Sequence, residues 1–230
     1  MSFFKNLALK ASKSFREKRI RIFSQHFDIS SSTKILDLGS EYGSHIHSVI
    51  SGTEILPQNV FIADISAEAV KKGQRLYGFT PVEITESGAL PFEEHFFDIV
   101  YCSSVIEHVT VPKEQVWQIK SGKEFRERAF SRQQEFAREV RRLGKQYFVQ
   151  TPYRNFIIES HTWLPFIAWL PRPVLIPVLR VVNSFWVKKT SPDWNLLDKK
   201  EMATLFPEGK VIEEKTAGLT KSLIAVKVIS

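Results

Sequence analysis

Short apolar runs alternate with amphipathic segments along most of the chain, a pattern that predicts strands joined by helices. Strands are predicted at residues 34–38, 60–64, 82–85, 97–103 and 146–151, and helices at residues 43–51, 67–77, 121–143 and 198–205. Because strands that are separated by helices form right-handed crossovers, the sheet is expected to be largely parallel.

The end of the chain predicts two further strands, at residues 210–215 and 223–228, with Ala217 and Gly218 between them. Their nearness indicates an antiparallel last strand. The predicted fold class is therefore α/β: a seven-stranded, mostly parallel, doubly wound sheet with helices on both faces.

Residues 155–187 do not follow this alternation. They include three of the five Trp residues and four prolines, at positions 165, 171, 173 and 177. Since proline interrupts helices, the pattern predicts short helices and turns beside the sheet and no long helix. We expect residues 152–195 to form an apolar insertion after the fifth strand that acts as a wall or lid for a substrate.

Positive charge is concentrated near the N-terminus. The chain has a net charge of +7, and residues 1–27 contain seven Lys or Arg side chains against one Glu. The remainder is close to neutral, so no nucleic-acid groove is expected. Residues 3–24 predict a basic amphipathic helix, for which packing on the core and peripheral contact with an anionic membrane both remain open.

The composition of the chain also bounds the compartment. No apolar run approaches the ~18 residues that span a bilayer. The single cysteine, Cys102, cannot form an internal disulfide. Both features fit a cytoplasmic protein, and the whole of residues 1–230 is expected to form one domain. The sequence gives no indication of the oligomeric state.

A glycine-rich turn directly follows the first predicted strand, in the string Asp37-Leu-Gly-Ser-Glu-Tyr-Gly43. Such a turn lets the backbone approach a ligand closely. Asp64 ends the second strand, where a carboxylate can accept both hydroxyl groups of a ribose. A nicotinamide dinucleotide and S-adenosylmethionine share this geometry, so both cofactors remain open at this point.

Two further strings occur in order, Glu86-Ser-Gly-Ala-Leu-Pro-Phe92 and a run from Phe97 through Glu107-His108. With the glycine turn and the acid at position 64, they resemble the class I S-adenosylmethionine-dependent methyltransferases, especially the branch that acts on small molecules. The resemblance covers roughly residues 33–151 and implies a Rossmann-like fold. It also implies a cofactor site made by Asp37, Gly39, Ser40, Glu41, Gly43, Asp64, Ile65, Glu86, Ser87, Gly88, Ala89, Ser103 and His108.

The chain departs from the family pattern at two of these positions. Glu41 stands where the family has its central glycine, and Glu86 stands where the family has Asp. A carboxylate beside the glycine turn would repel a pyrophosphate. The sulfonium and ammonium groups of S-adenosylmethionine tolerate it, which disfavours a nicotinamide dinucleotide.

The candidates for catalytic chemistry are Glu159, His161 and His108. A carboxylate near an imidazole can fix its tautomer and raise its basicity, so the pair at positions 159 and 161 can act as a base. A purely structural role for His161 is the alternative. The histidine spacing along the chain matches no metal-ligand pattern, so no metal is expected.

Taken together, the sequence predicts an enzyme that transfers a methyl group from S-adenosylmethionine to a small molecule. Two alternatives remain. One is a non-catalytic module that keeps the fold, and the other is an oxidoreductase that uses a nicotinamide dinucleotide.

Overall fold

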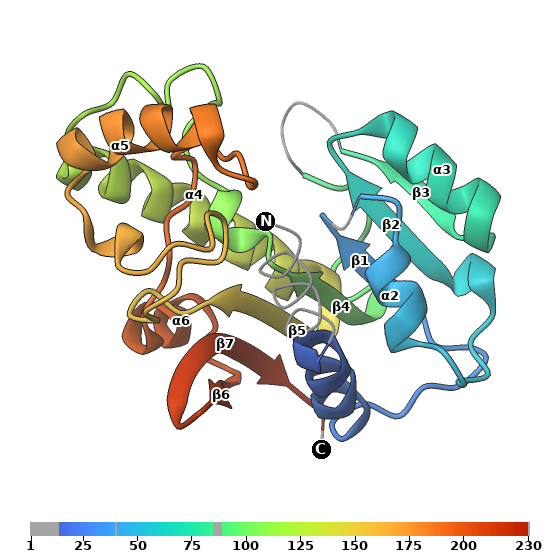
Figure 1. Ribbon diagram of the computed structural model, residues 1–230. Helices are drawn as coiled ribbons and strands as arrows, with labels where there is room; N and C mark the ends of the chain where they lie inside the picture. Colours follow the sequence, from blue (N-terminus) through green and yellow to red (C-terminus); the bar gives the residue numbers. More distant parts are fainter. Residues whose placement is uncertain (1–13, 40, 85–88, 230) are drawn as a thin grey trace.

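A seven-stranded sheet forms the centre of the molecule in the computed structural model, which describes residues 14–39, 41–84 and 89–229 (Figure 1). Its strands are β1 (Ile35–Leu38), β2 (Val60–Asp64), β3 (Thr80–Glu83), β4 (Phe97–Ser103), β5 (Gly144–Pro152), β6 (Lys210–Thr216) and β7 (Leu219–Lys227). Their order across the sheet is β3-β2-β1-β4-β5-β7-β6, and only β7 runs antiparallel to its neighbours. The predicted fold class is confirmed.

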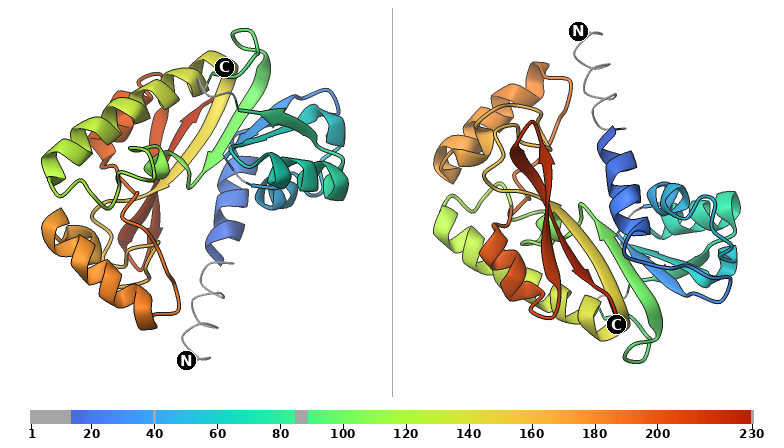
Figure 2. Two further views of the ribbon diagram at one scale, coloured as in Figure 1. Left: turned by 90° about the horizontal axis from the view of Figure 1, so that it is seen from above. Right: turned by 90° about the horizontal axis from the view of Figure 1, so that it is seen from below.

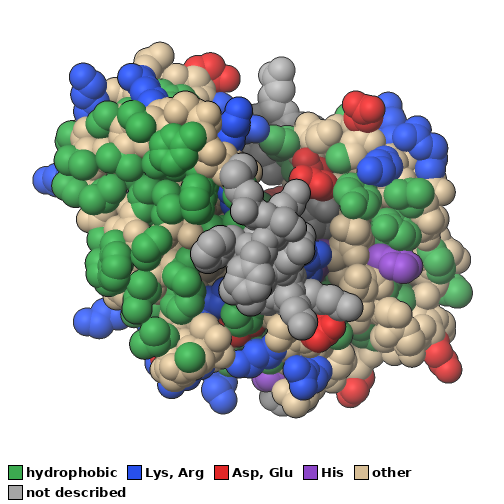
Figure 3. Space-filling view, in the orientation of Figure 1, with side chains coloured by type: hydrophobic (Ala, Val, Ile, Leu, Met, Phe, Trp, Pro, Cys, Tyr) green, Lys and Arg blue, Asp and Glu red, His purple; other side chains and the backbone are tan. Residues whose placement is uncertain are grey.

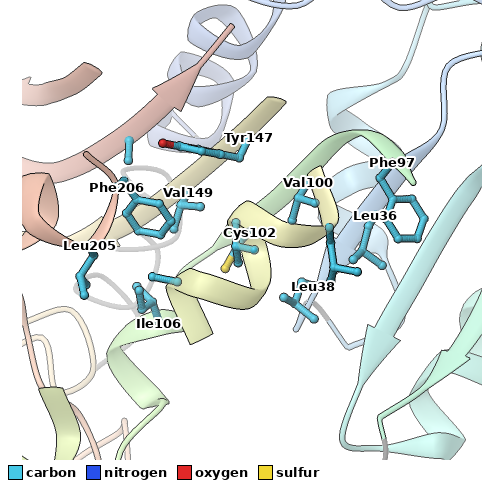
Figure 4. Close-up of a cluster of buried hydrophobic side chains, with 14 of the residues drawn as sticks. Leu36, Leu38, Phe97, Val100, Cys102, Ile106, Tyr147, Val149, Leu205 and Phe206 are labelled. Atoms are coloured by element: carbon cyan, nitrogen blue, oxygen red, sulfur yellow. The ribbon is translucent and has the colours of Figure 1, made fainter. Parts of the chain in front are cut away.

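Helices cover both faces of this sheet (Figure 2). They are α2 (Ser44–Val49), α3 (Ala67–Tyr77), α4 (Gly122–Leu143), α5 (Arg172–Phe185) and α6 (Lys199–Leu205), and residues 14–24 are also helical. On one face α4 and α6 pack over the buried cluster drawn in Figure 4, which includes Leu36, Val100 and Cys102. On the other face α2, α3 and residues 14–24 enclose Phe23, Ile62 and Tyr101.

Local sequence explains where α3 begins and ends. The Ser66 hydroxyl accepts a hydrogen bond from the backbone N–H of Ala69. Glu68 lies in the first turn, where its negative charge interacts favourably with the positive end of the helix dipole. Gly78 ends the helix in a left-handed conformation. The helix therefore begins soon after Asp64, the acid that ends β2, and its end leads the chain back to the sheet at β3.

The structure corrects two predictions that involve prolines. The third strand was expected at residues 82–85 and instead is β3, two residues earlier, because Pro81 is tolerated in a strand at the sheet edge. The prolines of residues 155–187 were expected to prevent a long helix, yet α5 has 14 residues. Pro173 lies in its first turn, where no backbone N–H is needed, and Pro177 has an exposed position.

A half-buried histidine on α2, His45, makes the stability of this fold depend on pH. The His45 Nδ1 lies 2.8 Å from the Tyr101 hydroxyl. Burial, followed by the positive charges of Arg19 and Arg16, lowers the pKa of His45 to about 4. The unfolded chain binds a proton at this histidine near pH 6.5, so unfolding takes up a proton between pH 6.5 and 4, and stability falls as the pH falls through this window.

We expect this histidine to remove about 3 kcal/mol from the free energy of unfolding between pH 6.5 and 4. Urea denaturation of His45→Gln should show a flatter pH dependence over that window. His95→Gln, which changes an exposed histidine, is the control and should retain the slope of the unchanged protein. Equal slopes in the two variants would contradict this assignment.

Candidate functional site

A cleft with a volume of about 770 Å³ opens at the carboxyl ends of β1, β2 and β4. Ligands of doubly wound sheets bind at this edge. The lining residues used below come from four parts of the chain and are Gly39, Asp64, Ile65, Ala89, Val105 and His108. They bring the predicted nucleoside side and the predicted acceptor side into one cavity.

The glycine turn forms the floor of this cleft. Gly39 has a φ of +85°, and its backbone N–H donates to the Ala63 carbonyl across 2.7 Å. A Cβ at this position would lie 2.5 Å from a methyl carbon of Val105, so only glycine fits. The turn is thus held against both β2 and the segment after β4, and its backbone is open to a ligand.

Asp64 is fixed by the backbone on either side of the cleft. Its Oδ2 accepts from the Glu41 N–H and its Oδ1 from the Ser66 N–H, each at 2.9 Å. A carboxylate has about four acceptor positions, so two hydrogen bonds leave capacity for two hydroxyl donors. Beside it, Ile65 is 77% exposed and lines the cleft, which leaves an apolar surface for a flat ring.

Glu41 adopts the left-handed backbone region that glycine would occupy, with a φ of +58°. Its side chain is exposed and is not among the residues that line the cleft, so it does not block the cavity. The departure from the family pattern is therefore a backbone cost of about 1 kcal/mol.

This cost gives a testable result. Glu41→Gly should raise the free energy of unfolding by up to about 1 kcal/mol, because it removes the strain. Glu41→Ala keeps the strained conformation and should give no gain. Urea denaturation of both variants measures the difference in the free energy of unfolding. An equal gain in the two would show that the Glu41 side chain, and not the backbone strain, lowers the stability.

The other predicted cofactor residues lie in varied positions. Ala89 lines the cleft, Asp37 is fully buried in β1, and Gly43 caps the start of α2. Ser40, Glu86, Ser87 and Gly88 lie outside the described residues. Ser103 is not among the lining residues: its hydroxyl donates to Gln150 at 2.9 Å and accepts from Arg19 at 3.0 Å, whereas the adjacent Ser104 lines the cleft.

The predicted catalytic residues meet beside the cleft. The His161 Nδ1 is hydrogen-bonded to the Glu159 carboxylate, and the His108 Nδ1 lies 3.3 Å from Asp193. The two imidazole rings contact each other edge to face with centroids 4.6 Å apart. His161 also stacks on Trp194 at 5.2 Å. His108 lines the cleft, and His161 lies behind it.

Burial and charge act against each other in this group. Burial lowers the pKa of His108, but the hydrogen-bonded Asp193 and the nearby carboxylates outweigh it, so this pKa lies above its ordinary value. Burial raises the pKa values of Glu159 and Asp193, yet hydrogen bonds with His161 and His108 hold both below their usual range. Both carboxylates are therefore ionised at neutral pH.

Sequence reasoning missed two members of this group. Glu107 is fully buried, and its Oε1 lies 3.9 Å from the His161 Nε2. Glu107 directly precedes His108 in the run that begins at Phe97, and this position was a signal that could have identified it. Asp193 contacts His108 across 85 positions of chain, and no local pattern marks such a contact.

Comparison with known proteins agrees with this geometry. Residues 36–120 match the family described as a methyltransferase domain. No curated protein matches the chain. The match confirms the predicted resemblance, and S-adenosylmethionine is the cofactor that it indicates.

Solved structures share the fold at low identity. A SAM dependent methyltransferase from Aquifex aeolicus is 12% identical, with 92% of this chain and 88% of that chain covered and a TM-score of 0.50. The magnesium protoporphyrin IX methyltransferase from Synechocystis PCC 6803, solved with bound SAH, is 14% identical, with 94% and 83% covered and a TM-score of 0.51. The small RNA methyltransferase HEN1 is 16% identical, with 94% and 25% covered and a TM-score of 0.50. Their different substrates show that the fold alone does not determine the acceptor.

Proposed function

We propose that this chain, which matches the methyltransferase domain family over residues 36–120, transfers a methyl group from S-adenosylmethionine to a small-molecule acceptor in the cytoplasm. One observation carries the proposal. A single cleft is lined both by the glycine turn and Asp64, which we assign to the cofactor end, and by His108, which we assign to the acceptor end. A cofactor and an acceptor can therefore meet within it.

The residues of the first end fit the cofactor. Asp64 has acceptor capacity for the two ribose hydroxyls, and the exposed Ile65 offers an apolar face to the adenine. Gly39 keeps the floor of the cleft free of side-chain atoms, so the methionine part can lie over the turn. The cofactor supplies an electrophilic methyl carbon on a positively charged sulfur.

The residues of the second end fit a nucleophile that must lose a proton. Methyl transfer by displacement needs alignment of the acceptor with the methyl carbon and exclusion of water. We assign acceptor deprotonation to the pair His108 and His161, which Asp193 and Glu159 orient. The acceptor oxygen or nitrogen bonds to the methyl carbon as the sulfur–carbon bond breaks, and S-adenosylhomocysteine leaves.

We propose an acceptor of apolar or aromatic character, because Val105, Val109 and Phe136 line the same cleft as His108. The segment 152–195 borders this cleft. It contributes Asp193 to the cleft and packs Trp194 against His161. We propose that this segment and residues 1–27 belong to the same domain as the sheet, with the former as the wall of the acceptor site. Residues 1–13 lie outside the described part of the chain.

Calorimetric titration with S-adenosylmethionine tests the function first. We expect one molecule bound per chain, followed by transfer of labelled methyl to a compound in fractionated metabolite extract. Absence of heat at millimolar cofactor would favour the non-catalytic module. Thermal protection by a nicotinamide dinucleotide in place of S-adenosylmethionine would favour the oxidoreductase.

A second proposal concerns peripheral contact with an anionic membrane. No helix in the described part of the chain is long and apolar enough to cross a bilayer. However, large apolar side chains gather on one side of the molecule, over α5 and the segment before it (Figure 3). Phe166, Trp169 and Phe185 are each more than half exposed there. The exposed Arg180 lies on α5, as does Phe185. Aromatic side chains beside cations favour an anionic interface.

Sedimentation with lipid vesicles measures this contact. The chain should bind vesicles that contain phosphatidylserine more strongly than vesicles of phosphatidylcholine alone. The double variant Trp169→Ser, Phe185→Ser should lose most of that binding. Leu76→Ser removes an exposed apolar side chain from α3 and should bind unchanged. Equal binding by both variants would refute the proposed surface.

A further inference from the structure

Three side chains with metal-binding atoms converge at the acceptor end of the cleft. Glu107, His108 and His161 each offer one ligand atom, and these atoms all lie within 4.8 Å of one another. Two of them are adjacent in the chain, and the third comes from the segment after β5. Ordinary packing does not require two imidazoles and a carboxylate to converge in this way.

In both histidines a carboxylate contacts Nδ1, which leaves Nε2 for a ligand. The Glu159 carboxylate is hydrogen-bonded to the Nδ1 of His161, and the Asp193 carboxylate lies 3.3 Å from the Nδ1 of His108. In each ring Nε2 is the remaining nitrogen, and that of His161 lies 3.9 Å from a Glu107 oxygen. Carboxylates that fix a histidine through its other nitrogen are a recurrent feature of metal sites, because they set the tautomer and the direction of the lone pair.

Glu107 supplies an independent indication. Its side chain is completely buried. Oε2 accepts a hydrogen bond from Thr151 at 3.0 Å, whereas Oε1 accepts none from the described part of the chain. A buried carboxylate oxygen without a hydrogen bond is costly unless a cation compensates it. The unsatisfied oxygen is the one that lies nearest the His161 Nε2.

We propose that Glu107, His108 and His161 bind a divalent transition-metal cation of the Zn²⁺, Mn²⁺ or Co²⁺ class. Two imidazoles and one carboxylate suit these ions, whereas Mg²⁺ and Ca²⁺ prefer all-oxygen sites. Metal–nitrogen and metal–oxygen bonds of about 2.1 Å place tetrahedral ligand atoms roughly 3.4 Å apart. Bringing the ligand atoms from within 4.8 Å of one another to that spacing requires side-chain rotations, for which the 37% exposed side chain of His108 has room.

The cation gives the site a substrate preference. Three protein ligands leave at least one coordination position open, and His108 lies on the cleft wall, so that position faces the acceptor. The role of the cation in methyl transfer, unlike metal binding itself, rests on the proposed function. An acceptor hydroxyl bound there loses its proton to solvent more readily, because the cation lowers its pKa. The resulting oxygen attacks the methyl carbon, the sulfur–carbon bond breaks, and an O-methyl product and S-adenosylhomocysteine leave. With the cation bound, both histidines are ligands and the solvent takes the proton, so the cation replaces them as the direct means of deprotonation. The acceptor class is then an alcohol or phenol.

Metal binding to the full chain is measured without any acceptor. The protein is stripped with a chelator and titrated with Zn²⁺ by calorimetry and with Co²⁺ by visible absorption. We expect one ion per chain and an absorption band that indicates nitrogen ligands. His161→Gln should weaken the affinity at least a hundredfold, and Glu159→Gln, which alters only the orientation of that histidine, about ten- to a hundredfold. His95→Gln changes an exposed histidine that is not part of the cluster and should bind as the unchanged protein does.

Two results would overturn the metal site. One is failure of the stripped protein to take up either ion, and the other is equal affinity in His161→Gln and His95→Gln. S-adenosylmethionine titration of the same samples shows that each variant is folded, and it separates the two proposals. Cofactor binding without metal binding refutes only the metal site. Metal binding without cofactor binding refutes only the proposed function.

Discussion

Asp64→Ala should lower the affinity for S-adenosylmethionine by about a hundredfold and abolish methyl transfer at ordinary cofactor concentrations. Hydrogen bonds to a charged group contribute about 1.5–3 kcal/mol each, and the carboxylate has capacity for two ribose hydroxyls, so the loss is at least about 3 kcal/mol. Calorimetric titration measures the affinity, and labelled-methyl transfer measures the activity.

The same carboxylate also organises the protein backbone, and this second role must be separated from the first. Asp64 accepts from the N–H groups of Glu41 and Ser66, so its removal also loosens the glycine turn. Asp64→Asn retains one carbonyl oxygen and should preserve one of these bonds, with an affinity between those of the unchanged protein and the alanine variant. Urea denaturation of both variants reports the structural part of the effect.

The neighbouring strand provides a matched control. Glu83 ends β3 and pairs with Asp64 across the sheet, but its side chain is exposed and is not among the residues that line the cleft. Glu83→Ala removes an equal charge at the same edge and should leave cofactor affinity within about twofold. If Asp64→Ala bound the cofactor as tightly as Glu83→Ala, the assignment of the ribose to Asp64 would be wrong.

The fold could be predicted wherever local pattern and tertiary environment agree. β2, α3 and β4 have the bounds that the sequence predicted, because a buried strand is an apolar run and an amphipathic helix between caps is a local event. β7 begins four residues earlier than predicted, at Leu219. The turn at Ala217 and Gly218 allows pairing with β6 to start at once, even though the first residues of β7 are polar or exposed.

The residues of the candidate site also divide into those that local sequence could identify and those that it could not. Gly39 and Asp64 could be found because each directly follows a strand, and the carboxyl ends of parallel strands meet at one edge. The contacts of His161 with Glu107 and of His108 with Asp193 could not be found, since each joins segments far apart in the chain. The expectation of no metal considered only spacing along the chain, and contacts of this kind have no spacing rule.

Arg172→Met should lower the free energy of unfolding by about 3–5 kcal/mol, although it keeps an unbranched apolar side chain at the start of α5. The Arg172 side chain is 6% exposed and packs over the Phe125 ring with its guanidinium 3.5 Å from the ring centre. It donates to the carbonyls of Val116, Ile119 and Pro192. Burial lowers the pKa of Arg172 to about 10, so it remains charged at neutral pH.

Removal of this guanidinium leaves three carbonyl oxygens without their donor, and each unsatisfied buried group costs about 1–3 kcal/mol. Arg172→Lys keeps the charge with a single nitrogen and should lose less. Arg180→Met removes an exposed arginine from the same helix and should cost under about 1 kcal/mol. Urea denaturation compares the three variants, and a similar loss for Arg172→Met and Arg180→Met would refute the argument.

The consequence for the site follows from the position of Pro192, which directly precedes the residue that holds His108. When Arg172 no longer binds the Pro192 carbonyl, Asp193 loses a fixed support and the His108 ring loses its orientation. We therefore expect Arg172→Met, at temperatures where it remains folded, to reduce methyl transfer more than cofactor affinity. A parallel loss of both would show that the guanidinium stabilises the fold as a whole and does not position the acceptor end of the cleft.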